Sequence, residues 1–119
     1  MKAGILYAVC FYGCNKIDYK GKDLLFILKE GARRVGATIT GETSYDFYPQ
    51  GTSAVLMLAE SHYAIHTFPE KKKAVACFHT CGNIDSWEAI KVVAHLLEAE
   101  KIISKKIDFD GYYFTLPET

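Results

Sequence analysis

The stretch that decides the fold is KAVACFHTCGNIDSWEAIKVVAHLLEAEKIISKKIDF, which covers residues 73–109. Residues 73–79 and 102–109 are runs of strand length rich in apolar side chains, so each predicts a β-strand. Between them, Asp85 and Glu88 have the spacing of a helix capping box. The helix predicted after this box carries four apolar side chains on one face, namely Trp87, Ile90, Ala94 and Leu97.

The residues before this stretch predict one more helix and three more strands. The helix covers residues 22–35, and its apolar stripe consists of Leu24, Leu28, Ala32 and Val35. Gly36 suits the position just after the end of this helix. The strands cover residues 4–12, 37–43 with a continuation over 45–48, and 52–59, and a turn signal lies at residues 49–51.

The predicted order of elements is β-α-β-β-β-α-β, with residues 60–70 as a loop. Two helices against one mostly antiparallel sheet form a two-layer sandwich of the α+β class, and residues 1–119 fit a single domain. A sheet with both helices on one face leaves its other face uncovered. Because so small a domain is marginally stable alone, we expect a dimer.

Charge and hydropathy argue against several classes of partner. The chain has 14 basic and 14 acidic residues, so its formal net charge is zero. A chain of zero net charge has no long-range electrostatic field that would attract nucleic acid or membranes. No apolar stretch reaches the roughly 20 residues that span a bilayer, and the N-terminus lacks the layout of a signal peptide. We therefore expect a cytoplasmic protein with reduced thiols.

The segment ESHYAIHTFPE, residues 60–70, directly follows an apolar strand and contains several Glu, Ser and His side chains that could take part in catalysis. Loops that leave rigid strands often carry active groups, and Ser61 with His66 suggests a hydroxyl nucleophile near a base. The alternative is that both are ordinary turn and surface residues. A serine hydrolase is disfavoured, because the chain lacks a Gly-x-Ser-x-Gly motif.

The four cysteines allow two interpretations. Cys81 precedes the second predicted helix, where a thiol can have a lowered pKa, although most free cysteines are small buried apolar residues. The pairs Cys10/Cys14 and Cys77/Cys81 have a spacing that would suit zinc. Since Cys10 and Cys77 fall inside apolar strands, we expect no metal site.

Taken together, these motifs resemble the short bacterial and archaeal form of S-adenosylmethionine decarboxylase. The resemblance covers nearly the whole chain and rests on Glu60-Ser-His-x-x-Ile-His-Thr-Phe-Pro-Glu70, Pro49-x-Gly-x-Ser53, Phe78-x-Thr-Cys-Gly82, Phe11-Tyr-Gly-Cys14, Gly36-Ala-Thr38 and Asp85-x-Trp87. It implies a homodimeric enzyme that decarboxylates S-adenosylmethionine and so supplies aminopropyl groups for spermidine.

The resemblance implies that the chain makes its own cofactor. Ser61 would attack the Glu60 carbonyl in an N→O acyl shift, and β-elimination would then leave a β chain of residues 1–60 and an α chain of residues 61–119. Ser61 would become a pyruvoyl group, which forms a Schiff base with the substrate amine and accepts the electrons freed by decarboxylation. His66 would remove the α-proton of Ser61, Ser53 would assist the acyl shift, and Cys81 would protonate the substrate carbon.

The same resemblance implies that Phe47 and Phe68 flank an adenine and that Glu70 binds ribose hydroxyls. The chain departs from the family pattern at Ile5-Leu6 (usually Arg-His), Cys10 (Glu), Tyr45-Asp46 (His-Arg), Ala64 (Ser or Thr) and Phe68 (Trp). These changes leave two alternatives open. One is an arginine or ornithine decarboxylase, with Asp46 meeting a cationic substrate side chain, and the other is a metal-binding relative that never cleaves.

Overall fold

The computed structural model describes residues 2–81 and 83–111. Over these residues the elements are β1 (Ile5–Tyr12), α1 (Gly21–Arg34), β2 (Ile39–Asp46), β3 (Thr52–Leu58), β4 (Ser61–Phe68), a short 3-10 helix (Pro69–Lys71), β5 (Lys73–Thr80), α2 (Ser86–Leu96) and β6 (Lys101–Asp108). Within this part of the chain, neither helix is long and apolar enough to cross a membrane.

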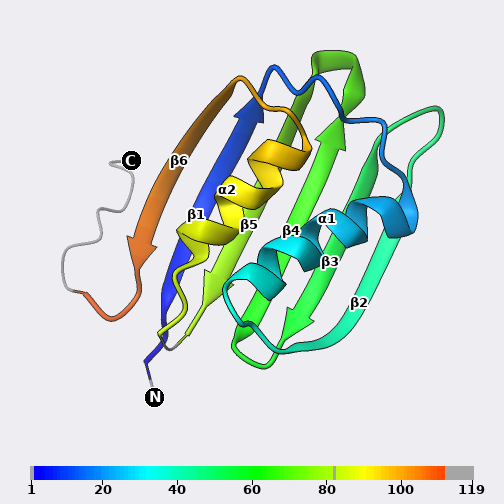
Figure 1. Ribbon diagram of the computed structural model, residues 1–119. Coiled ribbons are helices and arrows are strands. Elements are labelled where there is room, and N and C mark those ends of the chain that lie inside the picture. The colour runs from blue at the N-terminus through cyan, green and yellow to red at the C-terminus, as the bar shows by residue number, and fades with distance from the viewer. Residues whose placement is uncertain (1, 82, 112–119) are drawn as a thin grey trace, which may run out of the picture.

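The strands form one sheet in the order β2-β3-β4-β5-β1-β6, and every neighbouring pair is antiparallel. Both helices lie on the same face of this sheet, α1 over β2 and β3 and α2 over β5 and β1 (Figure 1). The prediction of an α+β sandwich with two helices on one face of an antiparallel sheet is confirmed.

The core lies between the helices and the sheet. The predicted stripe of α1 is buried there, with Leu24, Leu28 and Ala32 at 0% exposure. Phe11 and Phe78 belong to the same core on the sheet side and are equally buried. Full burial of one such side chain stabilises the fold by about 1.5–3 kcal/mol, so the helical stripe and the alternating strands together hold the two layers.

The predicted helix ends are largely confirmed. Gly36 follows α1 with a φ of 73°, a conformation that glycine adopts without strain. Asp85 caps α2, because its side chain accepts a hydrogen bond from Trp87 N at 3.1 Å. The expected partner in the capping box, Glu88, instead pairs its carboxylate with Lys91 Nζ at 2.8 Å.

Residues 60–70, which we expected to form a loop, instead form β4 and the 3-10 helix. The turn before β4 contains only Ala59 and Glu60, since Leu58 already pairs with Ser61. Tyr63 and Ile65 face the core, whereas the side chains directly before and after each of them face away from it. This alternation has the period of a strand, and it is the sequence signal that a loop assignment overlooks.

None of the helices or strands formed by residues 2–81 and 83–111 covers the sheet face opposite α1 and α2 (Figure 1). Side chains alternate between the two faces along each strand. The strand register therefore determines which side chains lie on the face away from the helices. They are Ser53, Val55, Met57, His62, Ala64, His66, Phe68, Val75, Cys77, His79, Leu6, Ala8, Cys10, Ile103 and Ile107. Met57 is 54% exposed and Ile103 is 49% exposed. We call this surface the open face; it carries the candidate site.

Candidate functional site

The predicted site residues fall into two groups at opposite ends of the open face. We call the first the cleavage cluster, and it consists of Glu60, Ser61 and Cys81 together with His62 and His79. We call the second the pocket cluster, and it consists of Phe47, Ser53, His66, Phe68 and Glu70. The β3–β4 hairpin and the end of β5 hold the first group, and the opposite ends of β3 and β4 hold the second.

The carbonyl oxygen of Glu60 accepts two hydrogen bonds from one residue. Cys81 N donates at 2.9 Å and Cys81 Sγ donates at 3.1 Å. The sheet register explains the contact, because Ser61 pairs with Thr80 and so places Glu60 opposite Cys81. Two donors on a carbonyl oxygen stabilise the negative charge that appears there when a nucleophile attacks its carbon.

The Ser61 hydroxyl lies between two imidazole rings. Its Oγ forms a short hydrogen bond with His79 Nδ1 and lies 3.2 Å from His62 Nδ1. Burial lowers the pKa of His62, and the adjacent His79 lowers it further. The backbone of Ser61 has a φ of 151°, which side-chain-bearing residues rarely adopt. Such strain costs on the order of 1–3 kcal/mol and is typical of functional sites.

The Glu60 side chain holds the hairpin in place. Its Oε1 accepts a hydrogen bond from Thr38 N at 3.0 Å. This bond holds the pKa of the Glu60 carboxyl below its usual value, so the group is ionised at neutral pH. The carboxylate therefore anchors the turn to the start of β2, while the Glu60 carbonyl faces Cys81.

The pocket cluster lines a hollow of about 280 Å³. Ser53 and His66 are paired across β3 and β4, and Ser53 Oγ lies 2.6 Å from His66 Nδ1. Phe47 and Phe68 both line the hollow and remain partly exposed, at 50% and 36%. The pocket thus brings every predicted substrate-binding residue together with two of the predicted catalytic ones.

The expected pairing of Ser61 with His66 is wrong for a single chain. His66 is five positions after Ser61 along β4, and a strand rises about 3.3 Å per residue, so the two lie roughly 16 Å apart. His79 contacts Ser61 instead, and His66 contacts Ser53. Sequence reasoning included His62 in the polar segment but gave it no role, and it overlooked His79. The alternation of β5, which puts His79 and Cys81 on one face, could have identified His79.

Asp46, the carboxylate considered for a cationic substrate, is engaged elsewhere. Its Oδ1 accepts hydrogen bonds from Gly21 N and Thr52 Oγ, each at 2.9 Å. Asp46 is paired with Thr52, whose side chain is buried on the helix side of the sheet. Asp46 therefore joins the start of α1 to the sheet.

The four cysteines do not converge on one point. Cys14 is buried beyond one end of β1, where burial raises the pKa of its thiol to about 11. Cys81 lies beyond the opposite end of the sheet, after Thr80. Among the described residues, no group of three or more His, Cys, Asp or Glu side chains is arranged to hold a metal ion. A four-thiolate site is therefore not built within one chain.

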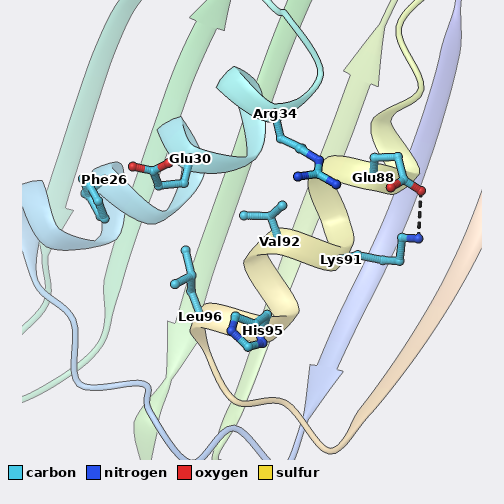
Figure 2. Close-up of a pocket in the computed structure, with 8 residues that line it drawn as sticks. All are labelled: Phe26, Glu30, Arg34, Glu88, Lys91, Val92, His95 and Leu96. Atoms are coloured by element: carbon cyan, nitrogen blue, oxygen red, sulfur yellow. Dashed lines mark ion pairs between the residues drawn. The ribbon is translucent and has the colours of Figure 1, made fainter.

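A separate groove of about 470 Å³ lies between the two helices. Figure 2 shows Phe26, Glu30 and Arg34 of α1 on one side and the residues of α2 on the other. Its lining includes none of the predicted site residues, and the groove is on the face of the molecule opposite the two clusters.

Comparisons with known proteins agree on one family. A family model described as S-adenosylmethionine decarboxylase matches residues 7–108. A protein of Caldicellulosiruptor saccharolyticus named S-adenosylmethionine decarboxylase proenzyme is 34% identical over 98 residues, which are 81% of this chain and 79% of that one. A protein of Thermotoga petrophila with the same name is 36% identical over 94 residues, 77% of this chain and 72% of that one.

The fold also matches a solved structure. The adenosylmethionine decarboxylase from Aquifex aeolicus VF5 superimposes with a TM-score of 0.80 over 98% of both chains, at 24% sequence identity. At that level of identity the likeness concerns the arrangement of helices and strands alone.

Proposed function

Because the chain belongs to the S-adenosylmethionine decarboxylase family, we propose that it is a proenzyme that cleaves itself between Glu60 and Ser61 and then decarboxylates S-adenosylmethionine. The observation that carries this proposal is the geometry of the cleavage cluster. The Glu60 carbonyl oxygen accepts hydrogen bonds from Cys81 N and Sγ, while the Ser61 hydroxyl contacts an imidazole nitrogen.

The proposed cleavage needs only groups of the protein itself and water. Ser61 Oγ attacks the Glu60 carbonyl carbon, and the Glu60–Ser61 amide becomes an ester. Loss of the Ser61 α-proton then expels the Glu60 carboxylate and leaves dehydroalanine, which takes up water and loses ammonia. The strained φ of Ser61 favours the reaction, since breaking the peptide bond releases that strain.

The residues around Ser61 fit the pyruvoyl group that this sequence of steps would leave. The donors on the Glu60 oxygen and the imidazoles at Ser61 Oγ are the groups that its formation requires. A pyruvoyl group supplies an electron sink for the charge left when carbon dioxide departs. The Cys81 thiol is the residue that we expect to return a proton to the substrate carbon, because a thiol can act as a proton donor and Cys81 Sγ lies 3.1 Å from the carbonyl oxygen of Glu60, next to Ser61.

The pocket cluster supports S-adenosylmethionine as the substrate. Phe47 and Phe68 supply ring faces on which an adenine can stack, and Glu70 supplies a carboxylate for ribose hydroxyls. The rival substrates, arginine and ornithine, lose their main support because the hydrogen bonds of Asp46 direct it to α1 and Thr52. The product would supply aminopropyl groups for spermidine, and the four free thiols suit the reducing cytoplasm.

We also propose that the active form is a dimer that joins two open faces. Ser61 and Cys81 lie at one end of this face, whereas Ser53 and His66 lie at the other. A two-fold axis through the face would bring one end of each chain against the opposite end of its partner. The exposed apolar side chains on the face, such as Met57 and Ile103, support this mode of association.

The experiment that tests the proposed function combines mass and product analysis. The wild-type protein should give two fragments that end at Glu60 and begin at residue 61, and the second fragment should lack a free amine. Carboxyl-labelled S-adenosylmethionine should release labelled carbon dioxide, whereas labelled arginine and ornithine should not.

The matched control for this experiment is Ser61→Ala, which should stay whole and release no carbon dioxide. A wild-type chain that remains intact, or one that cleaves but turns over only a basic amino acid, would contradict the proposal.

A further inference from the structure

We infer that His79 is the general base that activates the Ser61 hydroxyl for the first step of self-cleavage. This inference rests on the proposed function, since it assigns a residue to the reaction proposed above. The pair is formed by neighbouring strands: Ser61 begins β4, His79 is near the end of β5, and the two are 18 residues apart in sequence.

The hydrogen bonds of the His79 ring determine which nitrogen is free to accept a proton. Nε2 lies 2.8 Å from the carbonyl oxygen of Ala3. A carbonyl oxygen can only accept a hydrogen bond, so Nε2 carries the hydrogen and Nδ1 of the neutral ring is left as an acceptor. Nδ1 is the nitrogen in short contact with Ser61 Oγ, so the Ser61 hydroxyl donates its hydrogen to His79. The Ala3 carbonyl holds the His79 ring in the orientation that this bond needs.

A second ring contact holds His79 in this position. The ring of Phe109 packs edge-on against it with the centroids 5.6 Å apart. Together with the Ala3 carbonyl, this contact restricts rotation of the imidazole. A base held in the correct orientation loses less entropy when it acts, which is why catalytic bases are usually supported by a further residue.

His62 supports the nucleophile from the other side. The hydroxyl hydrogen of Ser61 is already donated to His79. In the second contact of Ser61 Oγ, at 3.2 Å, the oxygen therefore accepts a hydrogen bond from His62 Nδ1. Burial and the nearby His79 lower the pKa of His62, which keeps it neutral and able to donate. His62 is therefore a positioning residue that steadies the oxygen, and the proton passes to His79.

Every group that gives or takes a proton in the first step belongs to one chain. The proton of Ser61 Oγ moves to His79 Nδ1 as Oγ bonds to the Glu60 carbonyl carbon, and the charge on the carbonyl oxygen is held by Cys81 N and Sγ. When the bond from the Glu60 carbon to the Ser61 nitrogen breaks, that nitrogen takes a proton from the His79 imidazolium. An amide and a hydroxyl have become an ester and an amine, and His79 is neutral again.

The test follows cleavage of newly made full-length chains from a short pulse of cell-free translation. His79→Asn keeps an acceptor for Ser61 Oγ but cannot take a proton, and we expect it to cleave about 100-fold or more slowly, the usual loss for a general base. Hydroxylamine separates the steps, because it cuts esters and leaves amides intact. His79→Asn should resist hydroxylamine, whereas His66→Ala should accumulate the ester and be cut.

Two readouts distinguish a base from a structural residue. Added imidazole should restore part of the cleavage of His79→Ala. We expect the cleavage rate of the wild type to rise with pH, and this rise should be absent from His79→Asn. Among the described residues, the titratable and charged groups of this part of the open face are His62 on β4, Cys77 and Cys81 on β5 and its extension, and Lys105 on β6; β1 contributes Leu6 to the row of His79. The Asp110 carboxylate lies beyond β6 and accepts hydrogen bonds from the nitrogens of Ala3 and Gly4, next to the Ala3 carbonyl that contacts His79.

There are two controls. His62→Asn should slow cleavage by no more than about tenfold, because it removes one neutral hydrogen bond. His95→Asn, on α2, should cleave normally. Unfolding temperatures should confirm that all variants are folded. A His79→Asn chain that cleaves within threefold of a cleaving wild type would overturn this inference alone. A loss of ester formation in His62→Asn but not in His79→Asn would also overturn it, and a wild type that never cleaves would overturn the proposed function itself.

Discussion

Cys81 serves two purposes through two different atoms. Its backbone N and its Sγ both donate to the Glu60 carbonyl oxygen, at 2.9 and 3.1 Å. The backbone donor is independent of the side chain, whereas the thiol is a weak donor that other side chains can replace. Cleavage and decarboxylation should therefore respond differently to substitution at this position.

We expect Cys81→Ser to cleave at nearly the wild-type rate, because a hydroxyl also donates to the Glu60 oxygen. Cys81→Ala keeps only the backbone donor and should cleave about tenfold more slowly, less than the 100-fold typical of losing a strong oxyanion donor. Both variants should release little carbon dioxide, since neither has a thiol to protonate the substrate carbon. Gel analysis and carbon dioxide release measure the two effects separately. Equal cleavage rates in Cys81→Ala and the wild type would show that the thiol has no part in the first step.

At the scale of elements, close packing before β1 holds the cleavage cluster together. Gly4 has a φ of 95°, and a Cβ there would lie 2.8 Å from the Cα of Cys81 and would overlap the Thr80 carbonyl oxygen. Asp110 reinforces the contact from the other side, since its carboxylate accepts hydrogen bonds from the Ala3 and Gly4 nitrogens at 2.8 and 2.9 Å. These bonds lower the pKa of Asp110, so the carboxylate is ionised at neutral pH and ties the segment after β6 to the start of β1.

A glycine substitution tests this packing. Gly4→Ala should lower the unfolding temperature and slow self-cleavage, because the new methyl group displaces Thr80 and Cys81. Gly36→Ala is the matched control: its φ is also positive, at 73°, but no atom of the described residues lies within 4 Å of the added methyl group. The control should lose about 1–2 kcal/mol of stability from backbone strain and cleave normally. Equal effects of the two substitutions on cleavage would contradict the role of Gly4.

At the scale of the whole molecule, one chain holds two half-sites. The cleavage cluster and the pocket cluster are separated by the length of β4, about 16 Å from Ser61 to His66. A rigid sheet cannot bend to close that distance. If the residues of both clusters act on one substrate, they must come from two chains that pair through the open face.

Mixing two inactive variants tests this arrangement. Ser61→Ala lacks the nucleophile and His66→Ala lacks the base for the elimination step, so neither should complete cleavage alone. When they are coexpressed, a mixed dimer contains one intact site, and we expect the His66→Ala chain to cleave in that dimer. Protein mass spectrometry identifies which chain is cut. Absence of cleavage in a purified mixed dimer would contradict a site shared between subunits.

A charge on the open face provides an independent test of the same dimer. Met57→Glu places a carboxylate on this face and should give a folded monomer in sedimentation experiments. Phe26→Glu is the control, because Phe26 is similarly exposed, at 52%, but belongs to α1 on the opposite layer. A Met57→Glu protein that stays dimeric would place the interface elsewhere.

The periodicity of the sequence determined the two layers and the residues of the core. Apolar residues repeat with the helical period in α1 and α2, and runs of apolar residues mark the strands, because each pattern buries one side of its element. The Glu-Ser-His motif and its companions also identified the family. The strand period in β4 was present but obscured by polar residues, since its outward side chains include His62 and His66.

Only the tertiary structure decided which side chains meet. Ser61 and His66 are neighbours in sequence, yet an extended strand carries them far apart, whereas the register of β4 and β5 brings Ser61 to His79. The register depends on the length of the turn at Ala59 and Glu60. It also depends on which face of each strand is buried in the common core. These are properties of the assembled sheet. For the same reason, the direction of Asp46 toward α1 and the contact of Cys81 with the Glu60 carbonyl appear only when the strands are paired.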